Sequence, residues 1–396
     1  MTASTSVHSN AFNFLSFVQS GVDPRTGLYT VGLALDEVLS NDLRGPAVPL
    51  ALSYNPLNTL DSGYGLGWDL ALTQYTPSNQ VVSLHSGERF KVTGRDPGNP
   101  ARMLMKEQKI EGFQLYDISG DPRGDYKVVH KSGEVAILKL MGATPQVAMP
   151  VKLYSPQGHG VSLAYRADGG DGRMLGSVSD SQGTLLEVVP DTAAKTLEIR
   201  LKPVNGVASA VFVLHLSGGR VTRIALPTDN AAGWRFEYET LRGLLCIKDV
   251  WTPLGGHETL QYLDEGHGFP GSSGHQNIPR VTDHVLDPGA GQPPIIVKYS
   301  YSSNNFLCYN APITWTDDGL DNLYKVIGAY TYESTESLMV NDIAVRSVNR
   351  RFNRFHLLTA QTTTRGTHRQ TVTTTYYAND TDTFDNQVRQ CQLPKQ

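Results

Sequence analysis

Short apolar segments with a period of two, separated by glycine turns, constrain the fold of this chain more than any other feature of its sequence. The clearest segment covers residues 48–54, where Val48, Leu50, Leu52 and Tyr54 alternate with smaller residues. Alternate side chains of an extended chain point to the same face. This segment is therefore predicted to be a strand with one buried face.

Three pairs of such segments flank short glycine turns, at residues 86–87, 132–133 and 217–219. Glycine adopts the positive φ that a tight hairpin turn requires, so each pair is predicted to be a hairpin. Residues 359–375 contain nine threonines, and this β-branched bias favours strands. The best helical window, residues 334–345, is weak. We therefore expect an all-β protein of antiparallel hairpins that form large sheets, part of a shell or of sandwich-like units, with almost no helix.

Composition excludes several classes of protein. The apolar fraction of 39% is too high for a wholly disordered chain, and no apolar run is long enough for a membrane span. The net charge of −4, without a basic block, argues against nucleic acid as a partner. Three widely spaced cysteines form neither a disulfide framework nor a metal motif. The N-terminus lacks the pattern of a cleaved secretory signal.

A weak internal repeat runs from residue 172 toward the C-terminus. Residues 172–183, 219–238 and 244–262 share a scheme of strand, Asp or Pro turn, glycine and strand, and the latter two end in tyrosine. Degenerate copies cover residues 323–332 and 355–377. Hairpins of this size cannot bury a face alone, so each is expected to depend on its neighbours.

The N-terminal region carries the more specific motifs. Residues 21–31 read Gly-Val-Asp-Pro-Arg-Thr-Gly-Leu-Tyr-Thr-Val, and residues 41–46 read Asn-Asp-Leu-Arg-Gly-Pro. Residues 50–55 end in Tyr-Asn, and residues 63–68 read Gly-Tyr-Gly-Leu-Gly-Trp. From about residue 10 to the end, the chain resembles bacterial RHS-repeat proteins with tyrosine–aspartate (YD) repeats, including the B and C components of insecticidal toxin complexes.

This resemblance implies a container. In that family, β-sheet ribbons spiral into a hollow shell that encloses a C-terminal toxic effector, and an aspartate motif near the end of the core releases it. Residues 287–289, Asp-Pro-Gly, lack the spacing of that motif, and the sequence ends at residue 396 directly after repeat-like segments. We therefore expect an N-terminal portion of a shell, without enzymatic activity, cofactor or metal. Its expected partner is a C-terminal toxin or another toxin-complex chain.

The expected domains are a flexible tail over residues 1–20, a β unit over 21–150 and repeats over 151–265. A loop or linker rich in Gly, Pro and His follows over 266–294, and further strands over 295–396. The expected location is outside the producing cell, reached by a specialised route without a cleaved signal, with a cytoplasmic stage before export.

The motif residues have a structural interpretation. Asp23, Pro24, Arg25 and Gly27 are predicted to form a tight turn, because Asp caps it, Pro fixes φ and Gly takes a positive φ. Gly65 and Gly67 are predicted to allow close backbone approach while Trp68 packs in the core.

Two alternative functions remain open. The first is a module that binds carbohydrate or a cell surface, with an exposed tryptophan as stacking platform. The candidates are Trp68, Trp234, Trp251 and Trp315.

The second alternative is a glycoside hydrolase, which needs two carboxylates about 5–10 Å apart. The available carboxylates are Asp61, Asp69, Glu88, Asp180, Asp249 and Asp264. Most occupy turn positions, where Asp bonds its own backbone. The histidines at 257, 267, 275 and 284 match no zinc spacing, and residues 271–274 lack the context of a nucleophile elbow.

Overall fold

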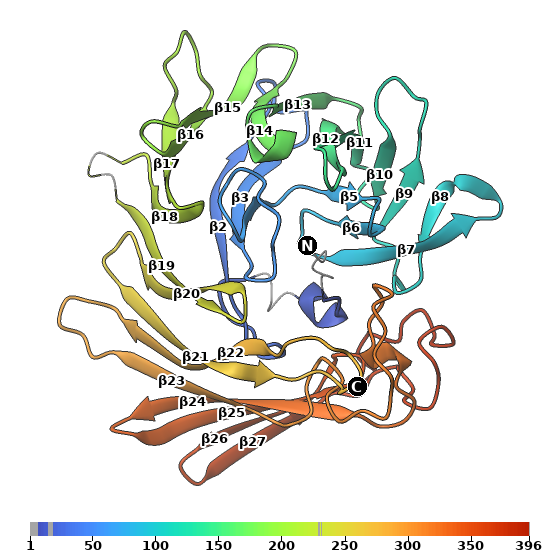
Figure 1. Cartoon of the computed structure of the whole chain (residues 1–396), viewed down its shortest axis with the longest axis vertical. Coiled ribbons are helices and arrows are strands. Elements are labelled where there is room, and N and C mark those ends of the chain that lie inside the picture. The colour runs from blue at the N-terminus through green and yellow to red at the C-terminus, as the bar shows by residue number, and fades with distance from the viewer. Residues whose placement is uncertain (1–6, 15–18, 229, 231, 396) are drawn as a thin grey trace. The chain divides into compact units, whose positions relative to one another are not determined.

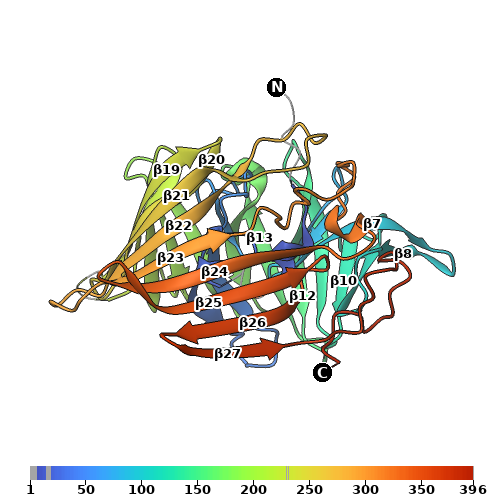
Figure 2. The ribbon, with the colours of Figure 1, turned by 90° about the horizontal axis from the view of Figure 1, so that it is seen from below.

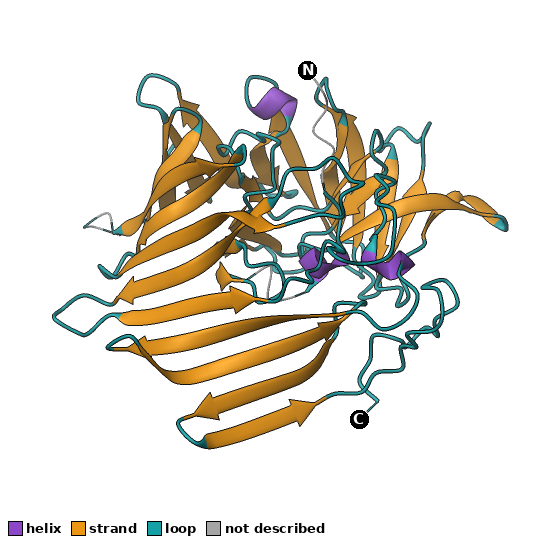
Figure 3. Ribbon diagram, turned by 60° about the horizontal axis from the view of Figure 1, so that its bottom comes forward, coloured by secondary structure: helices purple, strands orange, loops and turns teal. Residues whose placement is uncertain are grey.

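The computed structural model describes residues 7–14, 19–228, 230 and 232–395. Strands make up nearly all of the regular structure (Figure 3), which confirms the all-β expectation. The helical elements of these ranges are three 3-10 turns, η1 (Asn10–Asn13), η2 (Gly170–Gly172) and η3 (Leu323–Lys325). None of the helices among the residues described is long and apolar enough to cross a membrane.

The chain divides into two compact units. One comprises residues 1–31 together with 236–396, and the other comprises residues 32–235. Strands β2 (Tyr29–Val38) and β19 (Gly233–Leu241) each contain a division point, so neither unit is a simple stretch of sequence. We call them the split unit and the central unit.

The central unit contains a closed ring of eight antiparallel strands, β5 to β12 (Figure 1). Each strand pairs with the next along the chain, and β12 pairs back to β5 through Ala148 and Tyr75. The strands are β5 (Gln74–Thr76), β6 (Val81–Ser83), β7 (Arg89–Asp96), β8 (Asn99–Met105), β9 (Phe113–Asp117), β10 (Tyr126–His130), β11 (Val135–Met141) and β12 (Val147–Tyr154).

Side chains fill the interior of this ring. Alternate residues of successive strands form one apolar cluster that includes Val82, Leu115, Val128 and Leu138, all fully buried. A ring of eight strands is just wide enough for side chains to fill it. The ring therefore has a packed core, and its turns project from the ends.

From β12 the central unit continues as successive antiparallel strands, each paired with its sequence neighbour. These are β13 (Gly160–Arg166), β14 (Met174–Ser179), β15 (Thr184–Asp191), β16 (Thr196–Leu201), β17 (Ala210–Ser217), β18 (Arg220–Ala225) and the start of β19. The unit also contains the paired strands β3 (Val48–Tyr54) and β4 (Trp68–Leu70). The alternating burial of β3 confirms the one-sided strand predicted for residues 48–54.

The split unit is built on a sheet in which β20 to β27 follow one another in chain order (Figure 2). The strands are β20 (Leu244–Trp251), β21 (His257–His267), β22 (Ile278–Asp287), β23 (Ile295–Tyr301), β24 (Thr331–Val340), β25 (Ile343–Asn353), β26 (Leu358–Arg365) and β27 (His368–Thr373). Strand β1 (Gly21–Val22) pairs with the first residues of β2. The threonine-rich residues 359–375 lie mostly in β26 and β27, as predicted.

The three predicted hairpins are present. They join β6 to β7, β10 to β11 and β17 to β18. Gly87, Gly133, Gly218 and Gly219 all have positive φ, between 57° and 93°. These turns use glycine for the reason inferred from the sequence, because an L side chain is strained in this conformation.

Four expectations need correction. The window 334–345 is a hairpin rather than a helix, because its residues belong to β24 and β25, which pair on either side of a turn at residues 341–342. The segment 266–294 is not one continuous loop, because it contains β22. Pro279 of this strand falls at a register shift, where a proline is tolerated. The expected boundaries at 150 and 265 lie inside β12 and β21, whose pairing continues across them.

The fourth correction concerns the expected N-terminal tail. Residues 1–6 and 15–18 lie outside the described residues. In the described part, Ser9, Asn10 and Ala11 are at most 5% exposed, and Ser9 caps η1 by accepting a hydrogen bond from the Ala11 amide. The composition indicated a flexible tail, but specific contacts bury these residues.

Candidate functional site

The motif at residues 23–27 forms the predicted turn in the split unit. The buried Asp23 carboxylate accepts hydrogen bonds from the backbone amides of Arg25 and Thr26 and from the Thr26 hydroxyl, at 2.8–3.0 Å. Gly27 has φ +64°, and its amide donates to the Asp23 carbonyl. An added Cβ at Gly27 would lie 2.9 Å from Tyr301, so the turn needs glycine for space as well as for conformation.

Arg25 connects this turn to the segment between β25 and β26. Its Nε donates to the carbonyl of His356 at 2.9 Å. Its guanidinium lies 3.8 Å from the ring centre of Phe14 and 4.7 Å from that of Phe352. Burial lowers the pKa of Arg25. The arginine of the motif therefore acts as an internal link between distant parts of the sequence.

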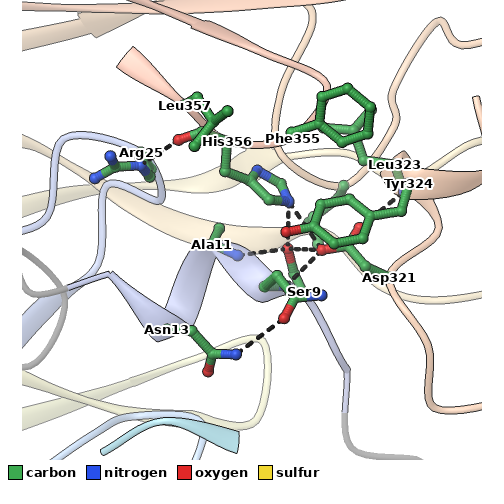
Figure 4. Close-up of polar contacts among 12 residues, drawn as sticks. Ser9, Ala11, Asn13, Arg25, Asp321, Leu323, Tyr324, Phe355, His356 and Leu357 are labelled. Carbon is green, nitrogen blue, oxygen red and sulfur yellow. Dashed lines mark hydrogen bonds and ion pairs between the residues drawn. The ribbon is translucent and has the colours of Figure 1, made fainter. Parts of the chain in front are cut away.

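A polar cluster in the split unit brings Ser9, Asp321 and His356 together (Figure 4). Ser9 precedes η1, Asp321 precedes η3, and His356 lies between β25 and β26 with φ +60°. His356 Nε2 is 2.8 Å from Asp321 Oδ2 and 3.4 Å from Ser9 Oγ. Exposure of the three residues is 3% or less.

The same three residue types form the triads of acyl-transfer enzymes, but the geometry here differs. In such a triad the carboxylate holds one imidazole nitrogen and the serine faces the other. Here Asp321 and Ser9 share Nε2, while Nδ1 lies 2.8 Å from the hydroxyl of Tyr332. Burial leaves the Ser9 hydroxyl without access for a substrate. The cluster is therefore a clamp that fixes residues 9–10 to two distant loops.

Charge stabilises the clamp. Burial raises the pKa of Asp321, but the adjacent His356 and the hydrogen bond from the Asn10 amide outweigh burial, and the net pKa is lowered. Asp321 Oδ2 accepts from that amide at 2.5 Å and from Ser9 Oγ at 3.2 Å. A buried carboxylate with this many donors is well compensated.

Arg354, two residues before His356, organises the C-terminal segment. Its side chain is fully buried, and its guanidinium donates to four backbone carbonyls and lies 3.6 Å from a carboxylate oxygen of Asp380. The carbonyls belong to Tyr324, Val326, Asn379 and Asp382. Burial lowers the pKa of Arg354. This one side chain joins the end of β25 to η3 and to residues 379–382.

Two of the four tryptophan candidates for sugar stacking are buried, which corrects that expectation. Trp68 is 0% exposed and packs against Tyr54, with ring centres 5.5 Å apart. Trp315 is 8% exposed and lies edge-on to Phe269, and its indole N–H donates to Asp317. A sugar needs an open ring face to stack on, and neither residue offers one.

The other two tryptophans are half-buried. Trp234 lies at the start of β19, and Trp251 ends β20. One face of Trp251 is already occupied by His257, which stacks on it with ring centres 4.4 Å apart. The four candidates come from different strands and turns.

Gly65 and Gly67 both lie where other parts of the chain approach the backbone closely. Gly65 has φ +92°, and an added Cβ would lie 3.2 Å from the Val221 backbone. Gly67 has φ +85°, and an added Cβ would lie 2.6 Å from the Tyr54 ring.

Three of the four histidines in or next to residues 266–294 lie beside different carboxylates. His257 lies 2.9 Å from Asp249, His275 lies 2.7 Å from Asp317, and His284 lies 2.8 Å from Glu258. His267 is buried, and burial lowers its pKa to about 3. Within the described residues, no group of three or more His, Cys, Asp or Glu side chains is placed to hold a metal ion.

The six candidate carboxylates of a hydrolase lie in different local networks. Asp61 and Asp180 accept backbone amides of their own turns, and Glu88 accepts the Ser86 hydroxyl. Asp69 accepts the Ser62 hydroxyl, Asp249 faces His257, and Asp264 pairs with Arg242. None of these contacts brings two of the six together.

Neither the comparison with protein-family models nor that with curated proteins gives a match for this chain. Ser9, Asp321, Arg354 and His356 were not identified from the sequence. Residues 317–321 signal a turn through their Asp and Gly content, but no spacing in the sequence connects residue 9 with 321 and 356.

Proposed function

We propose that this chain is a non-enzymatic structural segment of an RHS/YD-repeat protein of the toxin-complex type. Its sheets would contribute to the wall of a β-shell that encloses or delivers a toxic effector. The observation that carries the proposal is the change in burial along one face of the sheet β23–β27 in the split unit. That face is core at one end and open apolar surface at the other.

The strand register identifies this face. Tyr332 and Phe352 lie opposite each other and are 3% and 1% exposed. Ser334 lies two residues after Tyr332 in β24. It begins a row of directly opposed residues that continues through Arg350 and Gln361 to Val372. Residues directly opposite in an antiparallel ladder share a face, as do residues two apart in one strand. Val372 therefore shares the face of the buried Tyr332.

This face loses its cover toward β27 and toward the β24–β25 turn. Val372 is 54% exposed, and the opposed pair Val340 and Ile343 is 51% and 67% exposed. All six residues of β27 are exposed, so neither of its faces is covered. Exposed apolar surface and uncovered strands mark sites of association. A wall segment with this face turned toward an enclosed polypeptide explains both features.

The test uses co-expression of the chain with the proteins encoded beside its gene, followed by purification of any complex of fixed stoichiometry. Hydrogen–deuterium exchange should then show slower exchange in β25–β27 of the complex than in the free chain. Val372→Lys should abolish the complex, whereas Thr371→Lys, on the opposite face of the same strand, should leave it intact.

Two results would overturn the proposal. One is a complex whose protected residues all lie outside β23–β27. The other is saturable turnover of a glycoside or ester by the pure chain that one point substitution abolishes without unfolding it.

A further inference from the structure

Three basic side chains lie side by side on neighbouring strands of the split unit, close to the β26–β27 turn. Arg365 of β26 and His368 of β27 are directly opposed at that turn. Ser347 of β25 pairs with Thr364 of β26, so the next residue of each strand, Arg346 and Arg365, also face each other. We call Arg346, Arg365 and His368 the basic row.

The basic row lies on the sheet face described under the proposed function. Arg350 and Gln361 belong to that face and are directly opposed. Arg346 is four residues before Arg350 in β25, and Arg365 is four residues after Gln361 in β26. Residues an even number of positions apart in a strand share a face, so the row and the exposed apolar residues are parts of one surface.

The chain does not neutralise the basic row. The other arginines of β25 are ion-paired, Arg350 with Glu336 at 3.0 Å and Arg351 with Glu333 at 2.7 Å. Across the described strands β23–β27, the register leaves Glu336 as the single carboxylate on this face. Among the residues described, no ion pair joins a carboxylate to any member of the row.

This arrangement is unfavourable in the isolated chain. Arginine is charged at any physiological pH, and like charges directly opposite each other destabilise a sheet. In addition, Nε of Arg346 is buried and has no hydrogen-bond partner among the described residues. Buried donors nearly always have a partner. An anionic group from outside the chain would relieve both the repulsion and the unpaired donor.

Apolar side chains adjoin the row and indicate what kind of anion fits. Leu338 of β24 is opposite Arg346, and two residues further along β24 lies Val340, which is opposed by Ile343. Val340 and Ile343 are 51% and 67% exposed. Guanidinium groups pair with carboxylates through two parallel hydrogen bonds, and an exposed apolar pair favours apolar contacts.

We propose that the basic row binds an acidic segment of polypeptide. Its carboxylates pair with Arg346 and Arg365, and its apolar side chains cover Val340 and Ile343. The inference deepens the shell proposal and rests on it, because it names the chemistry of the polypeptide that this face meets.

A nucleic acid fits this surface less well. The row covers two strand spacings, about 10 Å, and the chain as a whole has a net charge of −4, which repels a long polyanion. In β24–β27 the aromatic residues of this face are Tyr332 and Phe352, and both are buried. They leave no open ring on which a base could stack.

The experiment measures binding of a capped, dye-labelled peptide of four glutamates followed by two leucines to the full chain, by fluorescence anisotropy. Binding should saturate, and it should weaken as salt rises from about 0.05 to about 0.3 M, because salt screens exposed charges. A peptide of four lysines followed by two leucines should not bind. These measurements on the unmodified chain do not depend on the folding of any variant.

Substitution then locates the site. Arg365→Gln removes an exposed charge of the row and should weaken binding of the acidic peptide roughly two- to fivefold. Arg369→Gln is the matched control, since Arg369 is an exposed arginine opposite Thr364, on the other face of the same hairpin. It should leave binding unchanged.

Three results would overturn the inference. They are equal binding of the lysine peptide, equal weakening by Arg369→Gln and Arg365→Gln, and tighter binding of a single-stranded oligonucleotide of the same charge than of the acidic peptide. The shell proposal fails separately. It falls if no co-expressed protein forms a complex although the acidic peptide binds at the row, whereas a complex that forms without any peptide binding overturns the present inference alone.

Discussion

Asp321 and His356 are 35 positions apart in the sequence, yet Asp321 Oδ2 lies 2.8 Å from Nε2 of His356 in the interior of the split unit. Ser9 joins the pair from the other end of the chain. A buried, hydrogen-bonded pair of this kind contributes little net stability when intact. It is costly to break, because removing one partner leaves a polar group buried without compensation.

Substitution of the clamp carboxylate is the first prediction. Asp321→Asn should lower the free energy of unfolding by about 3 kcal/mol, because it removes the charge that His356, Ser9 and the Asn10 amide all face. Asp318→Asn, which removes a partly exposed partner of Lys325, should lower it by less than about 1 kcal/mol. Urea denaturation followed by tryptophan fluorescence measures both. Equal losses for the two variants would contradict the clamp.

Glycine geometry gives the second prediction. Gly67→Ala should destabilise the chain by about 2 kcal/mol more than Gly120→Ala. Both glycines have positive φ, +85° and +95°, so the backbone strain is matched. Only at Gly67 does the new methyl group meet a side chain, the Tyr54 ring at 2.6 Å, while Gly120 has open space. Thermal unfolding followed by circular dichroism provides the comparison, and equal melting temperatures would refute the argument from close packing.

The third prediction concerns the pH dependence of stability. Burial raises the pKa of Asp69 to about 6, above its ordinary value of 3.8, despite the hydrogen bond from Ser62. Between these two values the folded state binds more protons than the unfolded state, so stability falls as pH rises. The loss should total about 3 kcal/mol and level off above pH 6.

Asp69→Asn isolates this contribution. The variant has no titrating group at position 69, so its stability should decline less than that of the original chain between pH 4 and pH 6. The two profiles should run parallel above pH 7. Urea midpoints measured at half-unit intervals of pH provide the test, and profiles that stay parallel across the whole range would show that Asp69 does not titrate there.

The fourth prediction concerns the C-terminal segment. Arg354→Lys should accelerate amide exchange in residues 379–391 by at least roughly tenfold, because an ammonium group cannot reach four carbonyls at once. Arg351→Lys is the matched control, since Arg351 lies three residues earlier, in β25, and pairs at the surface with Glu333 of β24. Hydrogen–deuterium exchange with mass spectrometry resolves the segment, and equal exchange in both variants would show that Arg354 is dispensable there.

Several elements could be predicted from local sequence because their causes are local. The strand at residues 48–54 follows from a period of two, and the turns at Gly87 and Gly133 follow from the positive φ that glycine tolerates. The turn at residues 23–27 follows from Asp and Gly at fixed spacing. In each case the interacting atoms are within a few residues of each other, so the sequence carries the whole signal.

Other features depended on contacts between distant residues. The period of two does not say which strand β12 pairs with, so the sequence could not reveal the ring that closes through Ala148 and Tyr75. Strand β22 forms within a Gly- and Pro-rich segment because β21 and β23 pair with its two edges. The N-terminal residues looked like a tail because Asp321 and His356, which bury Ser9, lie far along the chain.

The sequence by itself determined that this chain forms antiparallel hairpins, where those hairpins turn, and which face of several strands is apolar. Only the tertiary structure decided which polar side chains are buried together, that Trp68 and Trp315 are closed to ligands, and that the rings of His85 and His130 lie 5.3 Å apart. The physical reason is the separation along the sequence over which each interaction acts. Dihedral preferences and strand periodicity act between neighbouring residues. Burial and hydrogen bonding act between any residues that the fold brings into contact.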